Sequence, residues 1–261
     1  MTRPTSSSSD VVWSASDLSS DPHQAADKAD RVQRMFAAIA HRYDLNNRVH
    51  SLWRDQAWRR TAVVLSQVQP TDCVLDAACG TGDLAEAFAA AGAAEVVGVD
   101  FTSQMLTLAE HKAQRLRRAP GIAVPRYKQA DVMDLPFEDA NFDIVSIAFG
   151  IRNVTDPAKA LREFRRVLRP DGRVVILEFS QPRNRVLRLL NSIYCGHIMP
   201  FTATLLSGDR SGAYRYLPKS VASFADRQAL VGMLAEAGFV DITQHPMTFG
   251  VCVAYLGHVK S

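Results

Sequence analysis

Four aspartates and a pair of glycines in the first half of the chain are spaced in a way that could bind a small molecule. An apolar run ends at Asp76, and Gly80-Thr81-Gly82 follows it closely, with Asp83 next in line. Glycine lets the backbone turn sharply and lets a ligand approach the main chain. A glycine pair after a predicted strand is also found in dinucleotide-binding loops, so this motif alone leaves the ligand class open.

The charge around this loop favours a cationic ligand. A bound pyrophosphate needs an electropositive helix N-terminus, whereas Asp76 and Asp83 bracket the loop and would repel it. S-adenosylmethionine (SAM) carries a sulfonium and an ammonium group and no phosphate. We therefore predict that Asp76, Gly80, Thr81 and Gly82 bind SAM. The alternative is a tight strand-to-helix turn that its aspartates cap.

Two further acidic residues end the next two predicted strands. Asp100 ends the second strand, where a carboxylate can accept hydrogen bonds from both ribose hydroxyls. Asp131 ends the third strand, with Val132 beside it, where its carboxylate could accept a hydrogen bond from an adenine amino group. The carboxyl ends of parallel strands meet at one edge of a sheet, so the acids would converge there. The plainer alternative is that they cap helices and loops.

The segments that must position these residues alternate between strand and helix patterns. Strands are predicted at residues 73–77, 95–99, 124–130, 142–148, 173–179, 240–245 and 250–257. Helices are predicted at residues 53–66, 83–91, 103–117, 157–168 and 226–237. Such alternation is typical of βαβ units. We predict an α/β fold with a Rossmann-like, doubly wound, mostly parallel seven-stranded sheet, an antiparallel C-terminal hairpin and a helical cap.

The chain divides into a tail and one domain. Eight of the first 20 residues are serine, so residues 1–27 are predicted to form a disordered tail. Residues 28–261 would form a single domain, with a helical cap at 28–70 and a helical lid insertion at 183–222. No apolar run is long enough for a transmembrane helix, and the four cysteines lack metal-site spacing. We expect a cytoplasmic protein without a metal.

Two basic stretches flank a mildly acidic centre. Residues 31–60 hold seven basic and two acidic side chains, and residues 181–220 hold six and one. They could be solvated arginine faces, or they could meet an anionic partner such as a membrane surface or nucleic acid. Apolar residues between 186 and 206, interleaved with Arg183, Arg185 and Arg188 at their start, suit either a lid that borders a lipid tail or a core helix. That helix should break at Gly196 and Pro200.

The glycine loop and the three acidic strand ends together resemble the class I SAM-dependent methyltransferases. Further motifs narrow the resemblance to the quinone C-methyltransferases of menaquinone and ubiquinone biosynthesis, often called UbiE or MenG. These motifs lie at residues 43–47, 58–60, 149–156, 166–173, 177–180 and 213–220. The resemblance covers residues 31–250. The chain departs from the family pattern at Asn46, His50, Trp53 and Asp171.

The resemblance implies that SAM donates a methyl group to a ring carbon of a reduced isoprenoid quinone. Demethylmenaquinol is the expected substrate, with the benzoquinol precursor of ubiquinone as a second one. Arg152 would stabilise a phenolate and Asn153 would bind a quinol oxygen, with Tyr43 as a further catalytic candidate. Tyr216 and His197 are weaker candidates. Because the substrate lies in a membrane, we expect peripheral contact at the inner face of the plasma membrane. The alternative for Arg152 is a buried ion pair.

Three rival functions remain open from the residues themselves. Methylation of nucleic acid would suit the basic segments, but the chain has neither an Asn/Asp-Pro-Pro-aromatic motif nor a Pro-Cys pair. A nicotinamide oxidoreductase would use the Gly80 loop, but Asp83 argues against it. A non-catalytic SAM-binding protein would have no use for Arg152 and Asn153. We therefore expect no nucleic-acid partner.

Overall fold

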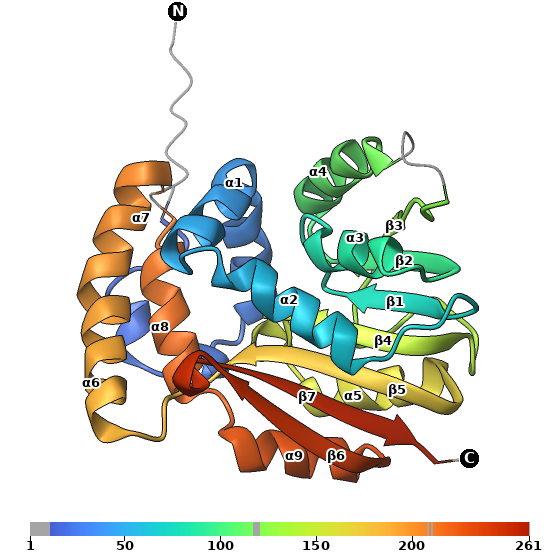
Figure 1. Ribbon diagram of the computed structural model, residues 1–261. Coiled ribbons are helices and arrows are strands. Elements are labelled where there is room, and N and C mark those ends of the chain that lie inside the picture. Colours follow the sequence, from blue (N-terminus) through green and yellow to red (C-terminus); the bar gives the residue numbers. More distant parts are fainter. Residues whose placement is uncertain (1–10, 117–120, 208, 210, 261) are drawn as a thin grey trace, which may run out of the picture.

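The computed structural model describes residues 11–116, 121–207, 209 and 211–260. Its centre is a seven-stranded sheet in the order β3-β2-β1-β4-β5-β7-β6 (Figure 1). The strands are β1 (Cys73–Ala77), β2 (Glu95–Asp100), β3 (Arg126–Gln129), β4 (Phe142–Ala148), β5 (Leu168–Phe179), β6 (Phe239–Met247) and β7 (Cys252–Val259). The first five are parallel, and β7 is antiparallel to β5 and β6. The predicted fold is therefore confirmed.

Helices cover both faces of the sheet. One face carries α2 (Arg54–Leu65), α3 (Asp83–Ala90) and α4 (Ser103–Ala113), and the other carries α5 (Pro157–Val167) and α9 (Arg227–Glu236) (Figure 1). Neighbouring strand residues point to opposite faces. Thus Val74 packs with Phe88 of α3, whereas Leu75 belongs to the cluster that contains Phe164 of α5. Both faces are buried, which explains the continuous apolar strands.

The order of the strands creates the ligand-binding edge. The chain runs from β1 outward to β2 and β3, and then returns to β4 on the other side of β1. The loops after β1 and β4 therefore leave the sheet in opposite directions. Open α/β sheets bind ligands at such a crevice, and this one lies beside the Gly80 loop.

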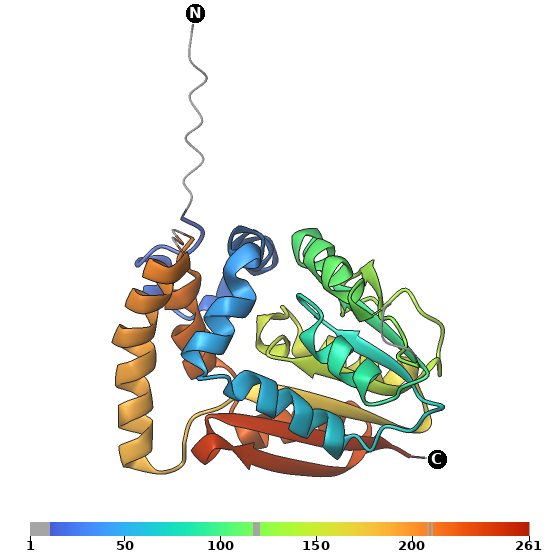
Figure 2. The same ribbon diagram turned by 45° about the horizontal axis from the view of Figure 1, so that its top comes forward.

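A group of helices lies beside the carboxyl edge of the sheet. It consists of α1 (Lys28–His50), α6 (Arg185–Ile193), α7 (Met199–Ser207) and α8 (Ala213–Ser223) (Figure 2). The second helix of the predicted cap, α2, contacts α1 but packs chiefly against β5, β7 and α3. The reason is its buried apolar side, which includes Trp58, Ala62 and Val63.

The predicted break at Gly196 and Pro200 is wrong. A π-helical turn, Tyr194–Ile198, joins α6 to α7 instead. Proline donates no backbone hydrogen bond, and a change of bonding pattern just before it lets the helix continue. The helix expected over 103–117 is shorter, because α4 ends at Ala113 and Arg117 lies outside the described residues.

The predicted tail requires a further correction. Residues 11–27 form two short 3₁₀ turns, Asp17–Ser19 and Pro22–Gln24, while residues 1–10 lie outside the described part of the chain. Trp13 is fully buried, and its ring stacks on Tyr216 at 4.8 Å between centroids. The serine content predicted disorder, but burying one tryptophan gives this segment enough apolar contact to pack.

No helix in the described residues is long and apolar enough to cross a membrane.

Candidate functional site

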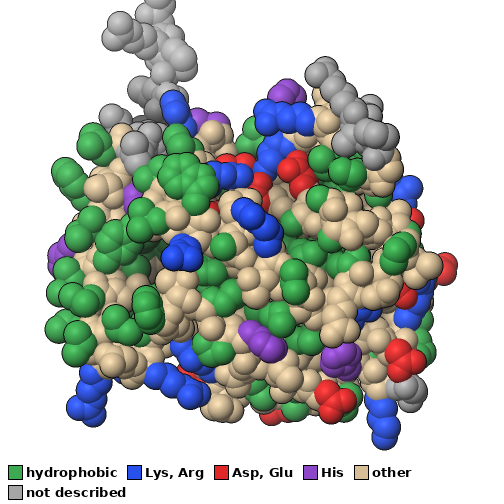
Figure 3. Space-filling view, in the orientation of Figure 1, with side chains coloured by type: hydrophobic (Ala, Val, Ile, Leu, Met, Phe, Trp, Pro, Cys, Tyr) green, Lys and Arg blue, Asp and Glu red, His purple; other side chains and the backbone are tan. Residues whose placement is uncertain are grey.

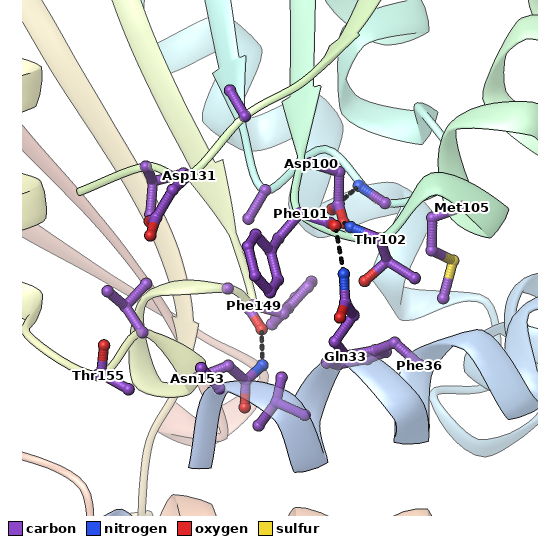
Figure 4. A pocket seen from close by; sticks show the side chains of 18 of the residues that line it. Gln33, Phe36, Asp100, Phe101, Thr102, Met105, Asp131, Phe149, Asn153 and Thr155 are labelled. Carbon is purple, nitrogen blue, oxygen red and sulfur yellow. Dashed lines mark hydrogen bonds between the residues drawn. The ribbon is translucent and has the colours of Figure 1, made fainter. Parts of the chain in front are cut away.

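A pocket lies where the ends of β1, β2 and β4 meet α1 (Figure 4). The chain segments that line it lie far apart in the sequence. They include Gln33, Phe36, Tyr43, Gly80, Asp100, Phe101, Asp131, Val132, Phe149 and Asn153. The predicted cofactor residues Gly80, Asp100, Asp131 and Val132 thus meet in one cavity, as do the predicted catalytic residues Tyr43 and Asn153.

Asp100 holds the glycine loop and also faces the pocket. Its two carboxylate oxygens accept hydrogen bonds from the backbone N–H groups of Gly80 and Thr102, both at 2.8 Å. Burial raises the pKa of this carboxyl. A carboxylate has about four acceptor positions, so two remain for ligand hydroxyls. The side chain therefore preserves the shape of the loop while it offers acceptors to a ligand.

Aromatic and amide side chains of the pocket were missed by the sequence analysis. Phe101 follows Asp100 directly and is 42% exposed, which leaves a flat apolar surface facing a ligand. Gln33 on α1 donates a hydrogen bond to the Phe101 carbonyl at 2.9 Å (Figure 4). An aromatic residue directly after the acidic strand end was the available signal for Phe101. Nothing in the sequence placed Gln33 beside it.

Asp131 lies at the other end of the same cavity (Figure 4). One carboxylate oxygen accepts a hydrogen bond from the Met133 N–H at 2.9 Å. The neighbouring Val132 is buried and forms part of the pocket wall. A carboxylate beside an apolar wall can bind the amino group of a flat heterocycle.

Three predicted cofactor residues do not line the pocket. Asp76 is buried behind it, accepts a hydrogen bond from Ser146 Oγ at 2.9 Å, and has its pKa raised to about 7 by burial. Thr81 instead donates a hydrogen bond to Asp44 Oδ1 at 2.5 Å. Gly82 adopts φ +82°, and a Cβ there would lie 2.3 Å from the Tyr127 hydroxyl oxygen. These three residues therefore support the glycine loop on the side that faces away from the pocket.

Asp83 does not repel anions from the glycine loop in the way that the sequence predicted, which was wrong, because ion pairs neutralise its carboxylate. Lys112 forms a close ion pair with Asp83, and Arg48 lies 3.2 Å from it. Burial alone would raise the pKa of Asp83, but these cations lower it to about 2. Lys112 also bonds Asp44 of α1 at 2.9 Å. We call Asp44, Arg48, Thr81, Asp83 and Lys112 the α1 clasp, since it ties α1 to the glycine loop.

Arg152 does not reach the pocket. It is 4% exposed, pairs with Glu178 at 2.7 Å and donates a hydrogen bond to the Phe149 carbonyl at 2.7 Å. The buried ion pair that the sequence left as an alternative is therefore what the structure contains. Burial raises the pKa of Glu178 even though Arg152 lowers it.

The other catalytic candidates differ in position. Tyr43 and Asn153 face the cavity, and burial raises the pKa of Tyr43. His197 is exposed on the π-helical turn. Tyr216 is buried, and its hydroxyl bonds the Asn153 side chain at 3.0 Å. Among the described residues, no group of three His, Cys, Asp or Glu side chains is arranged to hold a metal ion.

Solved structures share this fold at low sequence identity. A SAM-dependent methyltransferase from Thermotoga maritima, titled a possible histamine N-methyltransferase, aligns with a TM-score of 0.59 at 16% identity. The alignment covers 87% of this chain and 99% of that one. The [4+2]-cyclase SpnF aligns with a TM-score of 0.58 at 16% identity, covering 78% and 80%. These likenesses concern the fold, since fold alone does not determine the reaction.

Sequence relatives are much closer. A demethylmenaquinone methyltransferase of Thermus thermophilus is 46% identical over 85% of this chain and 99% of its own length. A ubiquinone/menaquinone biosynthesis C-methyltransferase UbiE of Citrifermentans bemidjiense is 41% identical, covering 89% and 97%. The model of the ubiE/COQ5 methyltransferase family matches residues 24–259. Because this match covers most of the chain and these relatives are more than 40% identical, the chain belongs to the ubiE/COQ5 methyltransferase family.

Proposed function

We propose that this protein methylates a ring carbon of reduced demethylmenaquinone to give menaquinol, with SAM as the methyl donor. The observation that carries the proposal is the single cavity that joins Asp100 and Asp131 with Asn153 and Tyr43. The 46% identity to a demethylmenaquinone methyltransferase supports the naphthoquinol as substrate. The benzoquinol precursor is a second candidate, because several relatives are named for both quinones.

The residues of the cavity fit SAM. Asp100 would accept hydrogen bonds from the ribose hydroxyls, and Phe101 would stack on the adenine ring. Asp131 would accept a hydrogen bond from the adenine amino group. When bound, SAM supplies an electrophilic methyl group on a positively charged sulfur. Gly80 adopts φ +55°. A Cβ built on this residue would have only one atom, of Tyr43, within 4 Å, so the Gly80 backbone is open to the ligand.

Side chains near the reacting carbon would act on the quinol oxygen. A quinol carbon becomes nucleophilic when the neighbouring phenol loses its proton. Asn153 and Tyr43, which both line the cavity, would donate hydrogen bonds to the resulting phenolate. The new carbon–carbon bond would form as the methyl–sulfur bond breaks, which would leave the sulfur as a neutral thioether. The ring carbon would then lose its proton to solvent and the ring would become aromatic again. The apolar walls of Phe36 and Phe149 would keep water away from the methyl group.

Arg152 and Lys28 would hold the turn that carries Asn153. This turn, Ile151–Asn153, is the short 3₁₀ helix after β4. Lys28 Nζ donates hydrogen bonds to the carbonyls of Arg152 and Val154, at 3.0 and 2.7 Å. Burial lowers the pKa of Lys28 to about 8. We assign both cations a positioning role, because neither lines the cavity.

The helical lid would rest on the membrane that holds the substrate. Its exposed apolar side, here called the lid face, carries seven side chains that are 46% to 76% exposed. They are Val186, Leu189, Leu190, Ile193, Ile198, Phe201 and Leu205. Figure 3 shows apolar side chains gathered over α6 and α7. Such a face on a helix flanked by arginines suits the interface of an anionic bilayer.

The test of the proposed function is methyl transfer from labelled SAM to defined quinols. Demethylmenaquinol and the benzoquinol precursor are supplied separately, each in reduced and in oxidised form. We expect label in the product from the reduced naphthoquinol and none from either oxidised quinone, because an oxidised ring carbon is not nucleophilic. Transfer to neither reduced quinol, with SAM binding intact, would reject the substrate assignment.

A further inference from the structure

The amide of Asn153 has a defined orientation in the pocket wall. Its Nδ2 donates a hydrogen bond to the Phe149 carbonyl at 3.3 Å (Figure 4). Its Oδ1 accepts one from the Tyr216 hydroxyl at 3.0 Å. Exchanging the amide oxygen and nitrogen would place two acceptor oxygens face to face at Phe149. The oxygen of Asn153 therefore points to Tyr216. One N–H of the amide remains for a ligand.

Tyr216 is itself held firmly from the other side. Its side chain is 1% exposed, and its ring stacks on Trp13 with an interplanar angle of 24°. Trp13 is anchored in turn, because the N–H groups of Val12 and Trp13 donate hydrogen bonds to the Ser211 carbonyl at 3.0 and 2.9 Å. Burial raises the pKa of Tyr216 to about 12, so its hydroxyl keeps its proton at neutral pH.

We propose that Tyr216 is a positioning residue for methyl transfer, whose hydroxyl occupies Asn153 Oδ1 and makes Asn153 present an N–H to the quinol oxygen. This inference rests on the proposed quinol methylation. An N–H stabilises the negative charge on a phenolate, whereas a carbonyl oxygen in its place would repel that charge. The N-terminal segment around Trp13 thereby contributes to the site without touching the ligand.

The conservative variant Tyr216→Phe isolates the hydroxyl, because it keeps the ring that stacks on Trp13. Without the Tyr216 hydroxyl, only the long hydrogen bond of 3.3 Å to the Phe149 carbonyl still orients the Asn153 amide, so the amide is held less firmly. We expect kcat to fall about 10-fold, the equivalent of one neutral hydrogen bond. The KM for SAM should not change, because Asn153 lies beyond the cofactor residues. Unchanged kcat would overturn the inference.

A double-mutant cycle separates positioning from packing. If Tyr216 acts through Asn153, Tyr216→Phe should change kcat by less than about two-fold in the Asn153→Ala background. The same loss of kcat in both backgrounds would mean that Tyr216 acts independently and would overturn the inference. Tyr214→Phe is the matched control, since it removes a hydroxyl from the same helix, and we expect it to leave kcat unchanged.

A spectroscopic readout keeps this inference separate from the proposed function. In protein labelled with ¹⁵N-asparagine, the side-chain amide signals of Asn153 are those that Asn153→Ala removes. We expect Tyr216→Phe to shift these signals and Tyr214→Phe to leave them in place. If the wild type methylates no quinol, the proposed function fails while this measurement still tests the Tyr216 contact. Signals that do not move in Tyr216→Phe would overturn it.

Discussion

At the scale of single residues, Asp100 both holds the glycine loop and lines the cavity. The carboxylate accepts backbone hydrogen bonds from Gly80 and Thr102, which orient its remaining acceptor positions toward the cavity. Asp76, on the adjacent strand β1, is buried and does not line the cavity. Two aspartates at neighbouring strand ends therefore have different tasks, because only one of them is exposed to the ligand.

We expect Asp100→Ala to weaken SAM binding roughly 10- to 150-fold, because a hydrogen bond to a charged group contributes about 1.5–3 kcal/mol. Isothermal titration calorimetry measures the affinity. Glu138→Ala serves as the control, since it removes an exposed carboxylate outside the cavity. SAM affinity equal to that of the wild type would contradict the assignment of Asp100.

Asp76 should make stability depend on pH. Burial raises its pKa from 3.8 to about 7, so the native state holds a proton that the unfolded state has lost between these values. As far as Asp76 is concerned, the free energy of unfolding is therefore highest below pH 4, and it decreases as the pH rises through 7. The variant Asp76→Asn has no ionisable group at this position, so its stability does not decrease in this way. Its amide oxygen can still accept the hydrogen bond of Ser146.

We therefore expect the stability of Asp76→Asn relative to the wild type to rise by roughly 2–3 kcal/mol between pH 5 and pH 8. Urea unfolding of both proteins at the two pH values measures this difference. All other titrating groups are shared, so they cancel. A difference that stays constant with pH would mean that Asp76 is ionised throughout.

At the scale of elements, the α1 clasp joins the helical group to the sheet. Lys112 of α4 forms ion pairs there with Asp44 of α1 and with Asp83 at the start of α3. Since α1 also supplies Gln33, Phe36 and Tyr43 to the cavity, the position of this helix decides whether the ligand is covered. Removing the positive charge of Lys112 should therefore weaken SAM binding, although Lys112 does not line the cavity.

Lys112→Met leaves two carboxylates close together and should loosen α1. We expect a loss of roughly 2 kcal/mol, less than for a fully buried pair because the side chains are partly exposed. Hydrogen exchange should quicken in residues 28–50, and the KM for SAM should rise. Lys159→Met, at an exposed position of α5, is the control. Unchanged exchange in α1 would show that the other contacts of α1 suffice.

At the scale of the whole molecule, the lid face lies on the same helix as the exposed Arg185 and Arg188, and Arg183 is exposed just before it. The core-helix alternative is wrong for α6, which has no buried residue, whereas Met199 and Ala203 of α7 are buried. Leu52 and Trp53 extend the apolar surface from the end of α1, where His50 bonds both Tyr194 and Thr202 of the lid. We expect the apolar side chains of this surface to contact lipid tails and the arginines at its edge to contact anionic headgroups.

We expect the wild type to sediment with anionic vesicles better than with neutral ones. Arg183→Gln, Arg185→Gln and Arg188→Gln together should weaken the anionic binding, at about 1 kcal/mol for each arginine that reaches the surface. Leu189→Ser, Phe201→Ser and Leu205→Ser together should weaken binding to both vesicle types. Salt should oppose only the arginine contribution.

Activity provides the control for these variants. Turnover of a tail-less quinol should remain at the wild-type level in both triple variants, because only the vesicle-embedded substrate requires the surface. If both variants bind vesicles as well as the wild type does, the lid is not the membrane contact. If turnover of the tail-less quinol falls as well, the substitutions disturb the cavity.

The sequence by itself determined the sheet and most of the cofactor edge. Apolar runs 73–77 and 142–148 became β1 and β4 with the same bounds, because a strand buried on both faces needs continuous apolar residues. Parallel topology then brought Gly80, Asp100 and Asp131 to one edge, since each follows a strand end. These inferences needed only local pattern and the rules of strand connection.

Only the tertiary structure decided which polar groups pair and which face the ligand. Arg152 was a plausible ligand contact in the sequence, but Glu178 on the adjacent strand β5 holds it. The serine-rich start of the chain predicted disorder, yet Trp13 finds Tyr216 near the other end. Such partners lie far apart along the chain. Whether they pair depends on how the surrounding structure buries them, and no local sequence pattern encodes that burial.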